Sequence, residues 1–448
     1  MHGLIPSVGP VTRTEARRGD VVAVSAAVVL VLVAAVVGRW LLAAGVDIFL
    51  GWPPLLAEWL PHVGPGTPAA VVVAVAVAAW GPGLAGRAVW RPLLWTAWAA
   101  ASAWTLSLAL VDGWQRGVVA RLSSSQEYLH DVPRVTSVGA MLREFADHIL
   151  TTQVDPAQTW FWTTHVGGHP PGAFLLFVWL DRLGLDGGGP AGIVVILAGS
   201  SACAAVAVTL RGVGQEDLAR RVLPFSVLFP GAVWVGVSAD GLFAAWLTWG
   251  VALVAVAASL RGVRGDLLAL AAGLLLGYAL YLSYGLVLGG LFPVAVLAAT
   301  RRWRVLAGAL AGVVVVVAAF TAAGFWWVKG YEHVRVIYAA SIAASRPYSY
   351  FVWADLAAVA FALGPAVVAA LHRISALPRP AAFLVLAALG AIVLADLSGM
   401  SKAEVERIWL PFAVWAVVGC GALSHPRRWL VAQAVLALAV NHLLLTVW

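Results

Sequence analysis

Charged residues are scarce in this sequence. They make up 11% of its 448 residues, whereas hydrophobic residues make up 62%, and the mean hydropathy is +0.91. A soluble domain carries about 25% charged residues, so this scarcity excludes an ordinary soluble protein. It predicts an all-α, polytopic membrane protein that lies in the lipid bilayer.

Cysteines are also few, and common nucleotide-binding and hydrolase motifs are missing. Cys203 and Cys420, the two cysteines, both lie in apolar runs, which gives neither a disulfide framework nor metal-ligand spacing. There is no Walker loop, no GxSxG motif and no HExxH motif. These absences argue against nucleotide-driven chemistry and against a nucleotide-sugar donor on the inner side of the membrane.

Long apolar runs are abundant, and a helix needs about 20 such residues to cross a bilayer. We expect about 13 transmembrane helices, with juxtamembrane helices in the first large outer loop. The first run is too long for a signal-peptide core, so we expect it to remain as a span. The runs lie near 21–45, 67–86, 92–112, 190–210, 222–238, 242–259, 266–281, 284–299, 303–325, 351–371, 381–396, 408–423 and 429–447.

Arginines occupy short loops between alternate apolar runs, and this pattern predicts an orientation. Cytoplasmic loops carry an excess of Lys and Arg, so we expect a multi-pass protein of the cell (plasma) membrane with a cytoplasmic N-terminus. The same anchoring explains the net charge of +7, and nucleic acid is not an expected partner. Most carboxylates then fall on the outer side, in loops 113–189, 238–241, 326–350 and 396–407.

The apolar segment 171–183 has about 13 residues, which is too few to cross the membrane. If it were a span, the arginine-containing loop 211–221 would lie outside, against the charge pattern. We therefore expect a juxtamembrane or re-entrant helix on the outer side.

The segment 123–172 is the most polar part of the chain. It holds the acids Glu127 and Asp131 and the histidines His165 and His169, together with several aromatic residues. A hydroxyl that attacks as a nucleophile must lose a proton, and such side chains can accept it. The alternative is a solvated loop without a chemical role. The aromatic residues and a rigid double-proline turn favour a functional site.

A second charged group lies just before a late apolar run. The segment 398–409 holds Lys402, Glu404, Glu406 and Arg407. An arginine can bind a phosphate through two parallel hydrogen bonds, and a neighbouring glutamate can orient it. The segment therefore predicts an anion site, and an ordinary interfacial charge cluster is the alternative.

The third polar segment, 326–350, alternates basic residues with tyrosines. Lys329, Tyr331 and Arg346 belong to it, and together they could recognise the head group of an anionic, sugar-bearing lipid. Interfacial snorkelling of long side chains is the alternative interpretation. Asp240 lies at a tight outer turn, and the sequence gives it no clearer role than that of a helix cap.

Two short motifs carry a resemblance to a known family. EYLHD at 127–131 follows an early apolar run, and GHPPG at 168–172 precedes the short apolar segment. Over about 92–425 the chain resembles the GT-C superfamily of polyprenyl-phosphate-sugar-dependent glycosyltransferases, especially the protein mannosyltransferase and aminoarabinose transferase branch. The chain departs from that branch in having two extra spans before the catalytic loop. The usual Asp-Glu pair is also absent, and Glu127-Tyr128 with Asp131 stands in its place.

The resemblance implies transfer of a hexosyl or pentosyl group from a polyprenyl-phosphate donor to an acceptor hydroxyl outside the membrane, with inversion. The acceptor would be a glycan, lipid or protein of the cell envelope. In this interpretation Glu127 or Asp131 is the base, and Arg407 holds the phosphate. No cofactor or metal is implied. The residues that would bind substrate are Tyr128, His165, His169, Lys329, Tyr331, Arg346, Lys402, Glu404, Glu406 and Arg407.

The same comparison divides the chain into two parts. Residues 1–91 form an N-terminal tail and two extra transmembrane helices, and residues 92–448 form a GT-C-like catalytic module with the outer catalytic loop 113–189. The competing hypotheses are a transporter or flippase of lipid-linked glycans, a polysaccharide ligase or polymerase, and a non-catalytic membrane scaffold.

Overall fold

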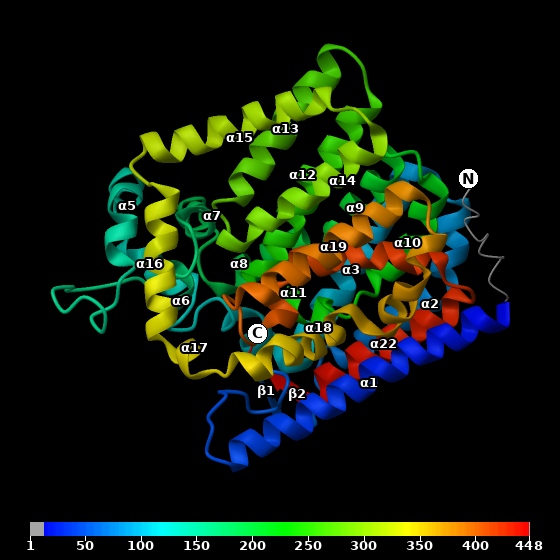
Figure 1. Ribbon diagram of the computed structural model, residues 1–448, viewed down its shortest axis with the longest axis horizontal. Coiled ribbons are helices and arrows are strands. Elements are labelled where there is room, and N and C mark those ends of the chain that lie inside the picture. Colours follow the sequence, from blue (N-terminus) through cyan, green and yellow to red (C-terminus); the bar gives the residue numbers. More distant parts are fainter. Residues whose placement is uncertain (1–12, 448) are drawn as a thin grey trace, which may run out of the picture.

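A computed structural model describes residues 13–447, and these residues are almost entirely helical (Figure 1). The regular strands found within them are β1 (Ala57–Trp59) and β2 (Leu444–Thr446), which pair antiparallel with Ala57 opposite Thr446. The expectation of an all-α chain is confirmed. The small sheet ties the loop after the first helix to the end of the last one.

The long helices follow the apolar runs closely. The helices are α1 (Arg13–Ala43), α2 (Thr67–Arg87), α3 (Trp90–Ala109), α4 (Tyr128–Asp131), α5 (Val138–Glu144), α6 (Thr164–Gly167), α7 (Pro171–Arg182), α8 (Gly188–Ser200), α9 (Ala202–Gly212), α10 (Glu216–Val227), α11 (Ala232–Val235), α12 (Ala239–Ser259), α13 (Val263–Ala279), α14 (Leu291–Thr300), α15 (Arg304–Ala322), α16 (Trp327–Ala340), α17 (Ile342–Ser345), α18 (Tyr348–Ala370), α19 (Arg379–Ser398), α20 (Val405–Ile408), α21 (Leu410–Ala416) and α22 (Pro426–Leu443). Short 3-10 or π turns complete the list: η1 (Leu110–Asp112), η2 (Gln115–Val119), η3 (Val132–Arg134), η4 (Phe145–His148), η5 (Tyr284–Gly290), η6 (Leu371–Ala376) and η7 (Val417–Ala422).

Eight helices in residues 13–447 are long and apolar enough to cross a membrane. They are Arg17–Ala43, Thr67–Arg87, Trp90–Asp112, Gly188–Gly212, Ala239–Ser259, Arg304–Ala322, Tyr348–Ala376 and Arg379–Ser398. The other apolar runs form helices that do not combine the required length and hydropathy: α10 and α14, for example, have 12 and 10 residues, and α22 has 18 residues but includes several polar side chains. A membrane-spanning architecture is thus supported, and the count of thirteen spans stays a prediction.

The first helix lies along the outside of the bundle (Figure 1). It packs against α18, and apolar side chains such as Val22, Leu32, Val36 and Trp40 remain more than half exposed. Exposed apolar side chains in such number suit a surrounding of lipid rather than water. By contrast, α2 buries an alanine stripe against α3, α10 and α22, so it belongs to the main core. Of the two helices expected to precede the catalytic module, α1 is therefore peripheral and α2 is part of the core.

Small helices and loops gather at one end of the bundle. In Figure 1, α5, α6, α7, α16 and α17 lie at the left, opposite the N-terminal end of α1. The short helix expected at 171–183 is present as α7, which has 12 residues and begins directly after the extended Pro170. Its length agrees with the prediction, and its place relative to the membrane stays a prediction.

One strained turn brings α20 to the same end. The helix α19 ends at Ser398, and Gly399 has a φ of 64°, in the left-handed region that favours glycine. Ala403 and Glu404 also have positive φ values, 71° and 62°, which are uncommon for residues with a side chain. Asp355 of α18 holds this turn, because its Oδ1 accepts a hydrogen bond of 3.1 Å from Ala403 N. Glu404 and α20 are thereby fixed beside the loop-rich end.

Candidate active site

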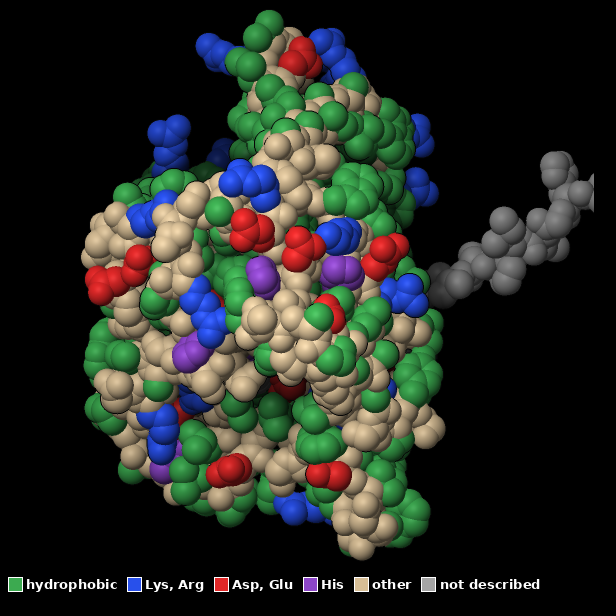
Figure 2. Space-filling view, turned by 90° about the vertical axis from the view of Figure 1, so that its left-hand side faces the viewer, with side chains coloured by type: hydrophobic (Ala, Val, Ile, Leu, Met, Phe, Trp, Pro, Cys, Tyr) green, Lys and Arg blue, Asp and Glu red, His purple; other side chains and the backbone are tan. Residues whose placement is uncertain are grey.

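A cavity of about 1060 Å³ opens at the loop-rich end. Figure 2 looks onto this end, where acidic, basic and histidine side chains surround a central hollow. The three polar segments identified in the sequence, 123–172, 326–350 and 398–409, all contribute residues to its wall, and η5 supplies a fourth side. Segments that are remote in the chain therefore meet at one site.

Arg407 is the centre of the polar part of this cavity. It is 5% exposed and donates hydrogen bonds to Asp240 Oδ2 at 2.5 Å and to Glu404 Oε2 at 2.8 Å. Its Nη2 atom also lies 3.4 Å from Nε2 of His165. Burial alone would lower the pKa of Arg407, but the carboxylates of Asp240, Glu404 and Glu127 outweigh that effect and raise it. The arginine is thus permanently charged and held from two sides.

The two carboxylates that the sequence proposed as bases have different surroundings. Glu127 is 3% exposed, and its Oε1 lies 3.3 Å from Nδ1 of His165, next to the arginine. Asp131 is fully buried, accepts a hydrogen bond of 2.7 Å from Thr163 N and pairs with Arg134 at 3.3 Å. Asp131 therefore fastens one segment of the loop to another, and Glu127 is the member of the pair that reaches the Arg407 cluster. A role as base stays a prediction for both.

Burial changes the protonation of Glu127. It raises the pKa of this carboxyl to about 8, against the lowering effect of Arg407. At neutral pH most molecules therefore carry Glu127 as the neutral acid.

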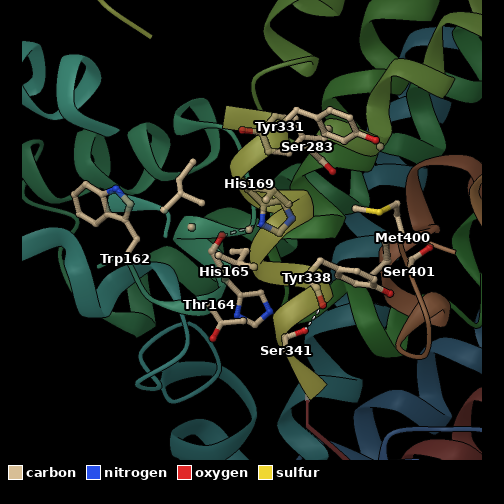
Figure 3. Close-up of a pocket in the computed structure, with 18 of the residues that line it drawn as sticks. Trp162, Thr164, His165, His169, Ser283, Tyr331, Tyr338, Ser341, Met400 and Ser401 are labelled. Atoms are coloured by element: carbon tan, nitrogen blue, oxygen red, sulfur yellow. Dashed lines mark hydrogen bonds between the residues drawn. The ribbon is translucent and has the colours of Figure 1, made fainter. Parts of the chain in front are cut away.

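His165 and His169 stand side by side on the cavity wall (Figure 3). The Nδ1–H of His165 donates to Gln126 O at 2.9 Å, and that of His169 donates to His165 O at 2.8 Å. Burial lowers the pKa of both imidazoles, and for His165 the charge of Arg407 lowers it further. Both rings are thus neutral, and each keeps Nε2 as a hydrogen-bond acceptor.

Tyr128 supports the site from behind. It is 1% exposed and stacks on Phe177 of α7, with ring centroids 4.8 Å apart. Its ring also lies 5.9 Å from that of His169. The structure therefore places Tyr128 as packing for the histidines rather than on the cavity surface formed by residues 13–447.

The segment 326–350 contributes to the cavity through its aromatic residues. Tyr331 and Tyr338 of α16 line it, and Tyr331 packs on Trp327 and Tyr284 with centroid distances of 5.5 Å. Lys329 is not brought to the Arg407 cluster. It pairs instead with Asp147 at 2.5 Å, and both side chains are about half exposed.

Arg346 and Lys402 hold two segments of the wall together. Arg346 Nη1 donates to Lys402 O at 2.7 Å, and Lys402 Nζ donates to Arg346 O at 2.9 Å. Arg346 also lies 3.8 Å from Glu404, which links it to Arg407 through a shared carboxylate. Glu406 is 1% exposed, and burial raises the pKa of its carboxyl to about 8. These residues form a layer behind the cavity wall.

Asp240 is the residue whose importance the sequence did not show. Its position in the first turn of α12 suggested a helix cap, but its carboxylate accepts a hydrogen bond from Arg407 at the cavity wall. Among residues 13–447 it is the only carboxylate on the cavity lining. The available signal was an acid in the short turn 238–241, between two strongly apolar segments.

No group of three or more potential metal ligands occurs among the residues that the structure describes. No protein-family model matches the chain, and no curated protein matches it. The functional argument therefore depends on the geometry of this cavity.

Proposed function

We propose that this chain is a membrane glycosyltransferase that moves a sugar from a polyprenyl-phosphate donor to an acceptor hydroxyl, with inversion and on the outer side of the membrane. The single observation that carries this proposal is the composition of the cavity. A buried arginine, neutral histidines and a carboxylate stand at its polar side, and apolar helix surfaces form another side.

The apolar side supports a lipid-linked donor. Leu286 and Leu288 of η5, Ile337 of α16, Leu394 of α19 and Phe412 of α21 line it. Burying one methylene group contributes about 0.8 kcal/mol, so a prenyl chain gains binding energy along such a wall. A water-soluble nucleotide sugar would gain little there.

The polar side supports a phosphate as the leaving group. Cleavage of the sugar–phosphate bond leaves extra negative charge on the lipid phosphate, and a fixed cation stabilises that charge in the transition state. Arg407 is already held by Glu404, so it loses little freedom when it binds an anion. A lipid phosphate is a weakly basic leaving group and departs without an acid to protonate it.

The remaining wall supports a polar acceptor. Loop residues from Thr151 to Trp162 border the cavity, including the aromatic rings of Trp160 and Phe161. The acceptor hydroxyl needs a base to remove its proton, and this assistance contributes about 10²–10⁴-fold to such reactions. A carboxylate of the Arg407 cluster would accept that proton.

The proposal is tested by removing the gene and following the lipid pool. We expect the deletion strain to accumulate a polyprenyl-phosphate-linked sugar and to lose that sugar from an envelope glycan, lipid or protein. The accumulated lipid is then offered to the purified protein together with envelope material from the strain. Release of free polyprenyl phosphate with transfer of the sugar supports a glycosyltransferase.

Two outcomes would contradict the proposal. An unchanged lipid pool in the deletion strain would show that the donor is not a polyprenyl-phosphate-linked sugar. Movement of the intact lipid across a vesicle membrane without release of the sugar would favour a flippase instead.

A further inference from the structure

We propose that Asp240 is the catalytic base, and that it occupies Arg407 until the donor phosphate displaces it. This inference rests on the glycosyltransferase function proposed above. In the structure Asp240 Oδ2 accepts a hydrogen bond of 2.5 Å from Arg407 Nη1. The arginine atom that a phosphate would approach thus already holds an anion, and that anion is a carboxylate at the cavity surface.

Position is the first reason for choosing Asp240. It is 4% exposed yet lines the cavity, whereas Glu127 and Asp131 do not appear on the cavity surface formed by residues 13–447. Phe243, one turn further along α12, lines the same wall and packs on His169 with centroids 5.7 Å apart. The first turn of α12 therefore faces the space where donor and acceptor would meet.

The state of the other two acids is the second reason. Asp131 accepts a hydrogen bond from Thr163 N and pairs with Arg134, so its carboxylate ties two parts of the loop together away from the cavity surface. Glu127 lies beside His165, and burial raises the pKa of its carboxyl to about 8, so it carries a proton at neutral pH. A base must be unprotonated when the substrate arrives.

The third reason is the way an anion would exchange at Arg407. Glu404 holds Nη2 at 2.8 Å from the opposite side and keeps the guanidinium in place. A phosphate can offer two oxygens to a guanidinium, and the Nη1 atom that it would approach now donates to Asp240 Oδ2. Once the phosphate occupies Nη1, the Asp240 oxygen has lost its donor and can accept a proton from a hydroxyl.

The reaction then proceeds as a single displacement. The acceptor oxygen forms a bond to the anomeric carbon while its proton moves to Asp240. The bond between that carbon and the phosphate oxygen breaks, and its electron pair stays on the lipid phosphate, which leaves beside Arg407. The order of events ensures that the base is released only after the donor has bound.

The first test measures binding of undecaprenyl phosphate to the purified full-length protein in lipid nanodiscs. Removing the competing carboxylate in Asp240→Asn should tighten binding about tenfold, and Arg407→Gln should weaken it at least tenfold. Asp266→Asn, at an exposed ion pair with Arg304, is the matched control and should bind as the wild type does. Equal or weaker binding by Asp240→Asn overturns the displacement step.

The second test measures transfer from the lipid accumulated in the deletion strain. Asp240→Asn should lose transfer at least 1000-fold although it binds the probe, and Asp240→Glu should keep wild-type affinity with a reduced rate. Retention of more than a tenth of the rate in Asp240→Asn overturns the base assignment. Complete loss of transfer in folded Asp240→Glu also overturns the base assignment. This second variant keeps the test decisive if Asp240→Asn does not fold.

These results separate the two proposals. If the wild-type protein neither binds undecaprenyl phosphate nor transfers a sugar, the proposed function itself fails. If it does both and Asp240→Asn behaves as the wild type, only the assignment of Asp240 fails, and Glu127→Gln then shows whether Glu127 is the base.

Discussion

Two clusters of arginine, aspartate and histidine occupy opposite ends of the molecule, and their chemistry is nearly the same. At one end Arg407 meets Asp240, with His165 nearby. At the other end Arg373 donates to Asp20 Oδ1 at 2.7 Å and to Oδ2 at 2.6 Å, and His372 lies 2.8 Å from the same carboxylate.

The difference lies in what surrounds each cluster. Arg373 and Asp20 join η6 to α1, and Arg373 also donates to Ala422 O of η7, so that cluster fastens the peripheral first helix to the bundle. Arg407 and Asp240 instead stand on the wall of the 1060 Å³ cavity. Residue types alone therefore do not distinguish an ion pair that joins two helices from one that lines a cavity, and only the surroundings of the pair do.

The largest effect is expected when each of the two arginines is replaced by alanine, because only one of the two variants should lose transfer activity. Arg407→Ala should reduce transfer at least 100-fold, because loss of one group that stabilises transition-state charge typically costs 10²–10³-fold. Arg373→Ala should keep transfer per folded molecule within about twofold of the wild type. Rates measured on equal amounts of monodisperse protein check this, and equal losses in the two variants would remove the distinction between the clusters.

The second prediction concerns pH and the buried acid Glu406. Its raised pKa, about 8, means that the folded protein keeps a proton that the unfolded chain releases near its ordinary value. The resulting stability is complete below about pH 4.5 and is lost as pH rises to about 8, by at most about 1.4 kcal/mol per pH unit. Glu406→Gln should flatten this part of the profile.

Thermal unfolding in nanodiscs between pH 5 and 8 measures this slope. The profile of Asp266→Asn should match the wild type, since that residue is exposed. If the profile of Glu406→Gln is as steep as that of the wild type, Glu406 is not the group that causes the pH dependence of stability.

The third prediction concerns the stability that the ion pair between Arg373 and Asp20 contributes. Arg373→Ala leaves the nearly buried Asp20 without its two guanidinium bonds, and breaking such a pair costs roughly 3 kcal/mol. We expect a lower unfolding temperature for Arg373→Ala. The double variant with Asp20→Asn should recover part of the loss, because no unpaired charge remains. Strict additivity of the two single effects would contradict a direct interaction.

The smallest effect is expected at Lys329, which the sequence grouped with the substrate-binding residues. Its partner is Asp147, and exposed pairs of this kind contribute about 0–1 kcal/mol. Lys329→Ala should change the affinity for undecaprenyl phosphate less than twofold. A loss of affinity as large as that expected for Arg407→Gln would show that Lys329 does take part in binding.

Much of the fold could be predicted because apolar runs are local features. Each of the thirteen expected runs contains helix, and the short segment 171–183 forms the separate helix α7. The number of runs that cross the membrane could not be derived in the same way. Local breaks shorten helices such as α10 and α14, so a long apolar run does not guarantee a helix that is long enough to cross the membrane.

The candidate site was predicted in pieces. Three polar segments were identified separately, and the structure shows that they share one cavity. Glu127 and Asp131 are four residues apart and looked equivalent, yet one reaches the Arg407 cluster and the other secures the loop. Asp240 looked like a helix cap, because its only local context is the start of α12.

The sequence by itself determined which segments are apolar enough to be buried in a membrane and which few carry charge, because both depend on composition over short windows. Only the tertiary structure decided which charges meet. Arg407 and Asp240 are 167 residues apart in the chain, and their contact follows from how α12 and α20 pack at one end of the bundle. That packing decides which carboxylate faces the cavity.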